Sequence, residues 1–450
     1  MRADPLSAPI LPTLLRMSAH NLVAMLLTAL VSVAETAYVS RLGVAALAGM
    51  ALVFPMVMLQ QMLSAGAMGG GISAAVSRAL GQRDTARAGV IAWHAVLICV
   101  ALGMAFTLVF RVWGEAIFSA LGGEGEALVQ ALAYADVAFC GSVAIWLTNA
   151  LASVLRGCGD MKTSSRVLLL VSVLQTVCGG VFGLGLGPIP AAGMGGVAAG
   201  QVIAFAVGAI WLWRALQSHE RGVRPAWFAA VQRIHLHDIL RVGAVASISS
   251  VQTVLAIVIL THIVAGFGTE ALAGYGIGTR LEFLLVPFTF AVGVSCVPLV
   301  GMALGAGQIE RARRVAWTGA FLSAGVVGVL GILFALAPQI WIGLFTRVPA
   351  VSGHAEVYFQ WVAPFFGLFA FGLCLYFASQ GAGRLLAPVL AGTLRLLIVA
   401  AGGYLMLLHG ASVQQLFALI GVAMLVYGVA TGVGVYFTTW GDVPSQSPTR

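Results

Sequence analysis

MSAHNLVAMLLTALVSVAE, Met17 to Glu35, places eighteen uncharged and mostly apolar residues before a single acid. A helix that crosses the hydrocarbon core of a bilayer needs about 20 residues of this kind. The pattern recurs along the 450-residue chain, which is 60% hydrophobic and only 8% charged. Soluble globular chains carry about 25% charged residues. The sequence therefore predicts an integral membrane protein built from spanning helices.

Charged residues mark the ends of the predicted spans. Uncharged runs cover 17–34, 42–77, 88–110, 137–155, 167–213, 242–269, 283–309, 315–346, 357–383 and 396–441. Two of these runs are long enough for two helices each. The first is divided by GLGLGPIPAAGMGG (Gly183–Gly196), whose Gly and Pro residues are typical of a turn, and the second breaks near LLHGAS (Leu407–Ser412). The prediction is an all-α fold with twelve transmembrane helices.

The distribution of Lys and Arg predicts the orientation. Of the 23 such residues, only Arg41, Arg111 and Arg347 fall in predicted outer loops, and Arg280 and Arg395 fall inside spans. The others lie in inner loops or tails if both termini are cytoplasmic, which agrees with the positive-inside rule. We expect a multi-pass protein of a bacterial cytoplasmic (inner) membrane. The net charge of +8 belongs to these loops, so no nucleic-acid partner is expected.

Three short motifs recur at half the chain length. GVAALAG at Gly43 returns as GTEALAG at Gly268, ALG at Ala79 returns at Ala303, and RGCGD returns as QGAGR with its first glycine moved from 157 to 381. The two copies of each motif are 225, 224 and 224 residues apart, so we infer an internal duplication. Six spans per half give both halves the same orientation, which predicts two lobes around a central cavity.

The duplication also predicts the domain boundaries. An N-terminal lobe covers 1–225, with spans one to six and part of a connecting cytoplasmic loop. A C-terminal lobe covers 226–440, and a short cytoplasmic tail covers 441–450. Two bundles around a cavity are typical of a transporter, whereas a channel would require charged rings.

Several classes of site are not indicated by the sequence. The six cysteines show no CxxC or metal-ligand spacing, which predicts neither disulfides nor a metal site. There is no GxSxG, no HExxH and no pair of acids at helical spacing within a span, so no catalytic residue and no enzyme is predicted.

Six stretches keep the order and spacing of one known family on this duplicated topology. They are VAETAYVSRLGVAALAG (Val33–Gly49), LRGCGDMKTSSRV (Leu155–Val167), GLGPIPAAGMGGVAAG (Gly185–Gly200), GTRLEFLLVPF (Gly278–Phe288), ALGAGQIERARRV (Ala303–Val315) and YFASQGAGR (Tyr376–Arg384). In these stretches the chain resembles the multidrug and toxic compound extrusion family. The resemblance implies two six-helix lobes, alternating access, and drug export driven by inward flow of protons or sodium ions, with no cofactor.

The resemblance also implies where coupling to the ion gradient would occur. The family's first helix carries an aspartate followed by threonine, and here these positions are Glu35 and Thr36. Proton-coupled members place a second aspartate on the fifth helix, where this chain has Gly179. The asparagine expected four residues earlier is Gln175, and the polar residue expected on the sixth helix is Gln201.

The second half lacks the acids of sodium-type relatives, which place them on the seventh and tenth helices. No acid lies between Val242 and Thr269, and Glu356 stands only at the start of span ten. The resemblance therefore favours a proton gradient and leaves sodium as the less favoured alternative.

Glu35 is a candidate coupling residue without reference to any family. A charged side chain inside a span costs roughly 2.5–3.5 kcal/mol, and such residues are usually functional. From the helical rise, Glu35 lies about 9 Å, Gln201 about 12 Å and Gln175 roughly 15 Å inside the outer boundary. These depths predict one polar pocket in the first lobe. Further candidates for this pocket are Thr36, Tyr38 and Asn149.

A single carboxyl group at this depth suggests a mechanism. Burial favours its protonated form, so Glu35 could take up a proton outside and release it inside. The ionised form attracts a cationic drug and the protonated form does not. We therefore expect proton-driven antiport of small organic cations or amphipathic drugs by a monomer in the lipid bilayer. The alternative is that Glu35 reaches the outer headgroups beside Arg41.

A second polar site is predicted in the C-terminal lobe. By the helical rise, Glu282 lies about 17 Å from the outer side and Arg395 about 14 Å from the inner side. In a core of about 30 Å these depths coincide, which predicts a structural Glu282–Arg395 ion pair and leaves Arg280 to face the cavity. A flippase for lipid-linked saccharides is the alternative function. Its anionic headgroup would require more arginines within the spans than these two.

Overall fold

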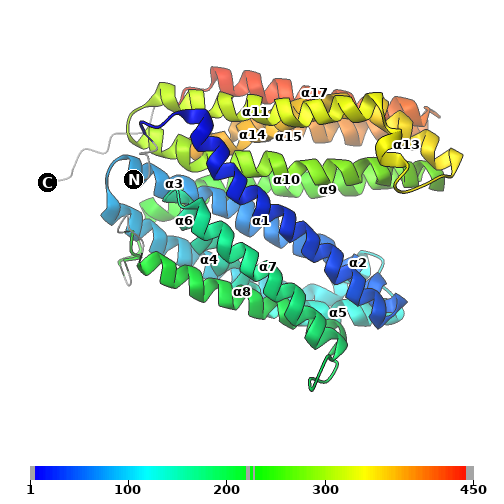
Figure 1. Ribbon diagram of the computed structural model, residues 1–450, viewed down its shortest axis with the longest axis horizontal. Helices are drawn as coiled ribbons and strands as arrows, with labels where there is room; N and C mark the ends of the chain where they lie inside the picture. Colours follow the sequence, from blue (N-terminus) through cyan, green and yellow to red (C-terminus); the bar gives the residue numbers. More distant parts are fainter. Residues whose placement is uncertain (1–5, 219–222, 227–228, 442–450) are drawn as a thin grey trace. The chain divides into compact units, whose positions relative to one another are not determined.

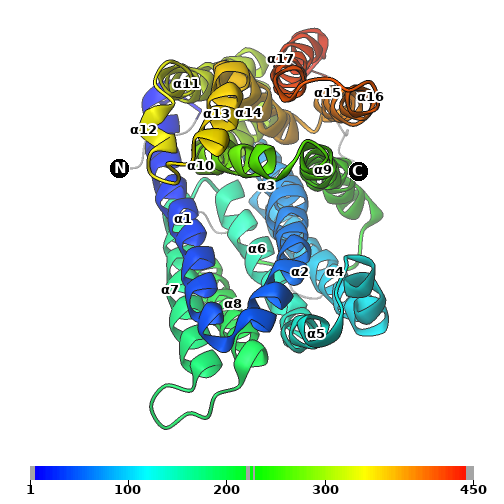
Figure 2. The same ribbon diagram turned by 90° about the vertical axis from the view of Figure 1, so that its right-hand side faces the viewer.

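The computed structural model describes residues 6–218, 223–226 and 229–441. Three arginines used in the orientation prediction, Arg2, Arg221 and Arg450, lie outside these ranges, as does the tail from Asp442. The described residues form helices and loops without a β-strand (Figures 1 and 2). The prediction of an all-α fold is therefore confirmed.

The helices follow one another with short connections. The α-helices are α1 (Ile10–Val39), α2 (Val44–Gln61), α3 (Gly69–Gly81), α4 (Thr85–Ala120), α5 (Gly125–Cys140), α6 (Ser142–Gly157), α7 (Met161–Leu184), α8 (Gly193–Gln217), α9 (Arg233–Ala265), α10 (Thr269–Gly305), α11 (Ile309–Leu336), α12 (Gln339–Ile342), α13 (Pro349–Trp361), α14 (Phe366–Ala382), α15 (Leu386–Leu397), α16 (Gly403–Leu408) and α17 (Val413–Phe437). Two 3-10 segments are η1 (Ser40–Leu42) and η3 (Ala363–Phe365). Two π-helical segments are η2 (Met62–Met68) and η4 (Ile398–Gly402).

Eleven helices of the described chain are long and apolar enough to span a membrane, and twelve spans result if α5 and α6 form one. These two helices bend by 49° at Gly141. A Cβ at Gly141 would overlap the side chain of Val202 in α8, so the missing side chain lets the bend pack against α8. The fourth predicted span corresponds to this bent pair, and the protein is a multi-pass membrane protein.

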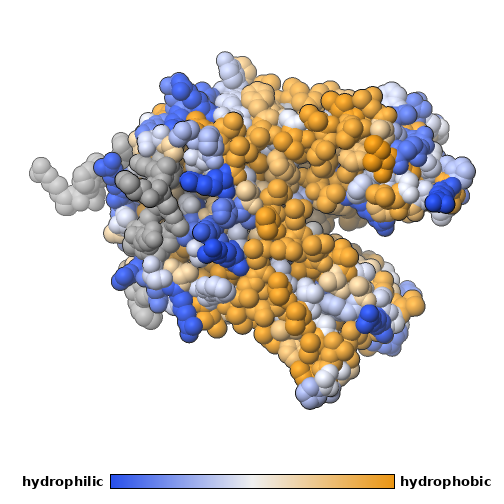
Figure 3. All heavy atoms as spheres, viewed as in Figure 1, coloured by the Kyte–Doolittle hydropathy of each residue, from blue (hydrophilic) through white to orange (hydrophobic). Residues whose placement is uncertain are grey.

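Side-chain chemistry along the helices agrees with this assignment. Apolar residues cover the middle of the helices, and hydrophilic residues gather toward their ends (Figure 3). Polar caps begin several helices: Asp84 accepts a hydrogen bond from the backbone N–H of Arg87, and Asp160 accepts one from Thr163. Such caps satisfy N–H groups that have no partner inside the helix.

Two compact units make up the chain. One runs from Ala19 to Ala244, and the other combines the segment up to Ser18 with the segment from Val245 onward. We call them the first and the second unit. The predicted lobes, 1–225 and 226–440, are defined by the internal repeat, and their boundary stays a prediction.

The segment between α8 and α9 is fastened to α4 within the first unit. The backbone N–H of Ala226 donates to the carbonyl of Gly89, and the N–H of Gln232 donates to Nε2 of His94 at 2.9 Å. His94 is fully buried, and its Nδ1 lies 2.8 Å from the carbonyl of Val90. An imidazole with Nδ1–H and a free Nε2 lone pair satisfies both contacts. His94 therefore anchors the connecting segment.

Candidate functional site

The candidate site begins with a buried acid on α1. Glu35 is only 6% exposed, and its Oε1 accepts a hydrogen bond of 2.8 Å from Nε2 of Gln175 on α7. Among the described residues, no Lys, Arg or His forms an ion pair with Glu35. The structure thus brings together the two residues that depth along the helices predicted to be neighbours. The alternative, a Glu35 that reaches the headgroups, does not fit this burial.

Tyr38 lies one helical turn beyond Glu35 and points toward the same helix, α7. Its side chain is 9% exposed, and its hydroxyl is a buried group with no hydrogen-bond partner among the described residues. A Cβ built on Gly179 would lie 2.7 Å from this hydroxyl oxygen. The Tyr38 hydroxyl therefore lies beside position 179, where the resemblance implies a second acid, and it leaves no space for a larger side chain there.

Close packing of α7 against α8 forms the other side of the site. The two helices run side by side in both views and are joined by the loop at 185–192 (Figures 1 and 2). A Cβ on Gly200 would overlap the backbone of Gly179, and a Cβ on Gly196 would overlap the backbone at Phe182. Small residues allow spanning helices to approach in this way. The glycines thus bring Gln201 toward the site.

Gln201 has a partner that the sequence did not indicate. Its side chain is 2% exposed, and its Oε1 accepts a 3.0 Å hydrogen bond from the hydroxyl of Tyr134 on α5. Tyr134 lies within electrostatic range of both Glu35 and Tyr38. Charged residues on either side placed Tyr134 in a predicted outer loop, before a span expected to start at 137. The helical spacing of apolar residues in Gly125–Cys140 was the available signal.

Two other predicted pocket residues lie elsewhere. Thr36 is exposed, and its hydroxyl donates to the carbonyl of Ser32 on its own helix. Asn149 on α6 is buried, and its amide donates to Oε1 of Gln61 and to the hydroxyl of Ser64. Neither forms a hydrogen bond with Glu35 or Gln175. The first-unit site therefore consists of Glu35, Tyr38, Tyr134, Gln175 and Gln201.

The second-unit residues are held differently from the expectation. Tyr358 donates a 3.2 Å hydrogen bond to Oε2 of Glu282, and the guanidinium of Arg395 lies over the rings of Phe369 and Tyr427, 4.8 and 5.7 Å from their centroids. Glu282 and Arg395 interact electrostatically, but they are not among the ion pairs within 4.0 Å in the described chain. A direct ion pair is thus replaced by contacts with aromatic rings.

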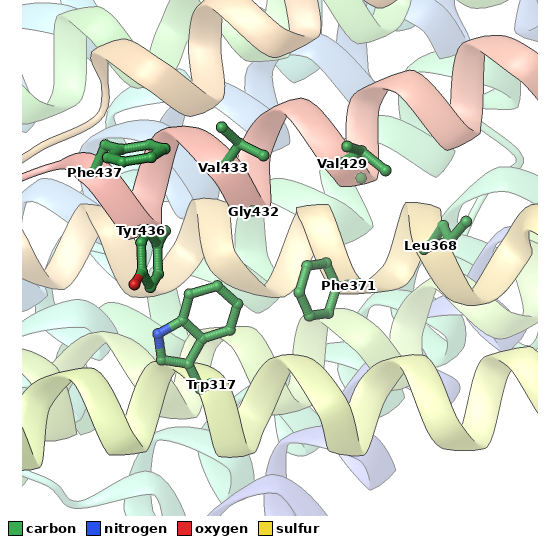
Figure 4. A pocket seen from close by; sticks show the side chains of 9 residues that line it. Trp317, Leu368, Phe371, Val429, Gly432, Val433, Tyr436 and Phe437 are labelled. Atoms are coloured by element: carbon green, nitrogen blue, oxygen red, sulfur yellow. The ribbon is translucent and has the colours of Figure 1, made fainter.

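Arg280 is exposed, and its guanidinium lies 5.2 Å from the centroid of the Phe345 ring. A separate apolar hollow of about 310 Å³ lies between α11, α14 and α17 of the second unit (Figure 4). Rings from all three helices line it, including Trp317, Phe371 and Tyr436. No predicted site residue lines this hollow, which instead suits lipid hydrocarbon.

Comparison with known proteins assigns this arrangement to a family. A sequence profile described as MatE matches the chain twice, over residues 22–181 and 246–405. The second match begins 224 residues after the first, in the register of the repeated glycines at 157 and 381. The two matches confirm the internal duplication.

Individual relatives agree with the profile. The chain is similar to an FAD transporter of Shewanella oneidensis, with 26% identity over 69% of this chain and 68% of the relative. It is also similar to a probable multidrug resistance protein NorM of Thermotoga maritima, with 26% identity over 80% and 78% of the two chains. A solved MOP superfamily transporter from Pyrococcus furiosus has the same fold, with a TM-score of 0.85, 24% identity, and 98% and 96% of the two chains covered.

Proposed function

The chain belongs to the MatE family of multidrug and toxic compound extrusion transporters, and we propose that it exports small organic cations or amphipathic drugs in exchange for protons. It is a transporter and not an enzyme. The observation that carries the proposal is the Glu35–Gln175 pair, a buried carboxylate on a spanning helix held by a neutral amide. An ionisable group of this kind inside a membrane protein usually marks an ion or substrate pathway.

The amide partner suits both states of the carboxyl group. When Glu35 is ionised, the NH₂ of Gln175 donates to it, as in the structure. When Glu35 is protonated, its O–H can donate to the amide oxygen of Gln175 after a rotation of the amide. Gain and loss of the proton therefore leave the pair hydrogen-bonded. The charge changes while the contact is kept.

The change in charge links drug to proton. In a medium of low dielectric constant, an ionised Glu35 attracts a cationic nitrogen strongly. Proton uptake removes that attraction and releases the drug on the outer side. Proton release on the inner side restores the site for the next drug. Alternating access then carries one proton inward for each cation exported through this site.

A proton fits the site better than a sodium ion does. Hard cations prefer several oxygen ligands, and carboxylates provide the charge that holds them. The site has one carboxylate, and the position of a second acid is Gly179, which Tyr38 overlies. A proton needs only one carboxylate. We place the carrier in a bacterial inner membrane, as a monomer with both termini in the cytoplasm.

A second candidate is export of an anionic amphipathic compound. It is favoured by the similarity to a protein named as an FAD transporter, since FAD carries two phosphate groups. A flippase for lipid-linked saccharides has less support. Of the two arginines predicted within spans, Arg395 lies among aromatic rings and Arg280 against Phe345.

The test is ethidium efflux from membrane vesicles with proton and sodium gradients imposed separately. We expect the proton gradient alone to drive efflux, and Glu35→Gln to abolish it while keeping the hydrogen bond to Gln175. Glu282→Gln is the matched control, because it removes a partly buried acid from the second unit. Normal proton-driven efflux by Glu35→Gln would refute the assignment of Glu35.

A further inference from the structure

Arg156 is a buried cation without a counter-ion in the described chain. It lies in the last turn of α6, and its side chain is only 7% exposed. Its Nη2 donates a 2.6 Å hydrogen bond to the hydroxyl of Ser153, and no described acid forms an ion pair with it. Buried charges in proteins are normally paired, because an unpaired one is costly. The charge of Arg156 is therefore not balanced by any described acid.

The guanidinium is held in place by a chain of side chains. Ser153 accepts from Arg156 and donates its own O–H to the carbonyl of Asn149 at 2.6 Å. Asn149 is fixed in turn by Gln61 of α2 and Ser64 of the π-helical segment η2. π-helical segments are frequent at functional sites. The position of the charge is thus set before any ligand arrives.

The remaining donors of Arg156 are available. A guanidinium has five N–H donors, and a single hydrogen bond uses one. The nitrogens that make no bond are not fully enclosed, in contrast to Nε of Arg87, which is both enclosed and without a partner. Gly69 packs closely against the bonded side of the group, since a Cβ there would lie 2.6 Å from the Ser153 hydroxyl and 3.4 Å from Nη2 of Arg156.

The equivalent position in the internal repeat carries no charge. In the register of Gly157 and Gly381, the position equivalent to Arg156 is Gln380. Gln380 is fully buried, and its amide donates a 3.1 Å hydrogen bond to the hydroxyl of Tyr376. A neutral amide therefore occupies the same place at the end of the corresponding helix. The two halves thus share this helix end but not its charge.

We propose that Arg156 binds an oxyanion, a carboxylate or a phosphate, carried by the transported molecule. Guanidinium groups bind such planar or tetrahedral oxyanions with two parallel hydrogen bonds. The proposal rests on the transport function and adds a substrate class to it. Amphipathic compounds with an acidic group, zwitterions included, become substrates, and Glu35 need not be the only group that selects them.

Two dyes that differ in one acidic group test the proposal. Rhodamine 123 is the methyl ester of rhodamine 110, so both carry the cationic ring system and only the second has a free carboxylate. Binding to purified protein is followed by fluorescence polarisation for wild type, Arg156→Gln and Arg156→Lys. We expect Arg156→Gln to weaken rhodamine 110 binding about tenfold and to leave rhodamine 123 within about twofold. Arg156→Lys should lose less affinity for rhodamine 110, because it keeps the positive charge and loses only the two parallel N–H donors of the guanidinium.

Controls separate the possible outcomes. Arg314→Gln removes an exposed arginine that pairs with Glu310, so it changes the net charge equally and should affect neither dye. If Arg156→Gln loses affinity for both dyes equally, or for neither dye, the proposed oxyanion site is overturned. Melting temperatures verify that each variant is folded. If Arg156→Gln does not fold, Arg156→Lys, which retains the charge, provides the comparison with wild type. Absence of proton-driven rhodamine 123 efflux by wild type would contradict the proposed function and leave the binding result intact.

Discussion

The hydroxyl of Tyr38 occupies the space that a side chain on Gly179 would require, because a Cβ at 179 would lie 2.7 Å from the hydroxyl oxygen. These two residues, on α1 and α7, are therefore complementary. One fills a volume that the other leaves empty.

This complementarity predicts a coupled pair of mutations. Gly179→Ala should destabilise the protein by roughly 1–3 kcal/mol, as overpacked substitutions do. Tyr38→Phe removes the oxygen in the way, so the double variant should be more stable than Gly179→Ala alone. Thermal unfolding in detergent measures the cycle. Equal melting temperatures for Gly179→Ala and the double variant would show that the hydroxyl is not the obstacle.

Removal of the amide partner should affect coupling. Gln175→Leu keeps a similar volume but leaves Glu35 without its 2.8 Å hydrogen bond. A buried charge-assisted hydrogen bond contributes about 1.5–3 kcal/mol, so we expect proton-driven efflux to fall at least tenfold. The control is Gln252→Leu, which removes a partly buried amide contact with Thr393 in the second unit. Similar losses in both variants would argue against a special role for Gln175.

Close contact between α7 and α8 should tolerate no side chain at Gly200. A Cβ there meets the backbone of Gly179, which cannot rotate away, so Gly200→Ala should destabilise by at least about 1–3 kcal/mol. Gly114→Ala on α4 is the matched control, because its Cβ would meet nothing within 4 Å. We expect Gly114→Ala to be neutral or slightly stabilising. The measurement is the shift of the melting temperature in each variant.

The anchor at His94 predicts a change in protease sensitivity. His94→Leu keeps the buried volume but cannot accept the hydrogen bond from the N–H of Gln232. Trypsin should then cleave after Arg233, which directly follows Gln232, several-fold faster than in wild type. His409→Leu, at an exposed histidine near the end of α16, is the control. An unchanged cleavage rate in His94→Leu would mean that the segment is held by its other contacts.

In the second unit, Glu282→Gln should lower stability more than it alters coupling. The hydroxyl of Tyr358 can still donate to the amide oxygen, but Arg395 loses its nearby negative charge. We expect a lower melting temperature and unchanged dependence of efflux on the proton gradient. Loss of proton-driven efflux at a wild-type melting temperature would transfer coupling to this unit.

Depth along a helix could be predicted from the sequence, but direction around its axis could not. Counting residues from charged ends placed Glu35 and Gln175 at neighbouring levels, and the structure joins them. The same counting placed Glu282 and Arg395 at one level, yet Arg395 lies against Phe369 and Tyr427. Which neighbour a side chain meets depends on helix rotation, which residue counts do not contain.

Residues beyond a charged boundary were also missed. Tyr134 lies two residues before Asp136, so the search for uncharged runs excluded it from a span. In the structure α5 begins at Gly125, and Asp136 pairs with Arg111 at 3.0 Å on an exposed face. A charge on the outer face of a helix does not end the helix. The partner of Gln201 was lost for this reason.

The second half of the chain repeats the fold of the first half but not the acid Glu35, and this difference affects the energetics of transport. Positions 224 and 225 residues after Glu35 are Ile259 and Leu260, and the position corresponding to Gln175 is Val399, so the second half copies the scaffold without the acid. In the proposed mechanism one carboxylate moves one proton per cycle, and exchange of that proton for a monovalent cation transfers no net charge. Such a pump is electroneutral: membrane voltage does no work on it, and the pH difference alone sets the drug gradient. A zwitterionic cargo would instead leave one net positive charge moving inward, and voltage would then assist its export.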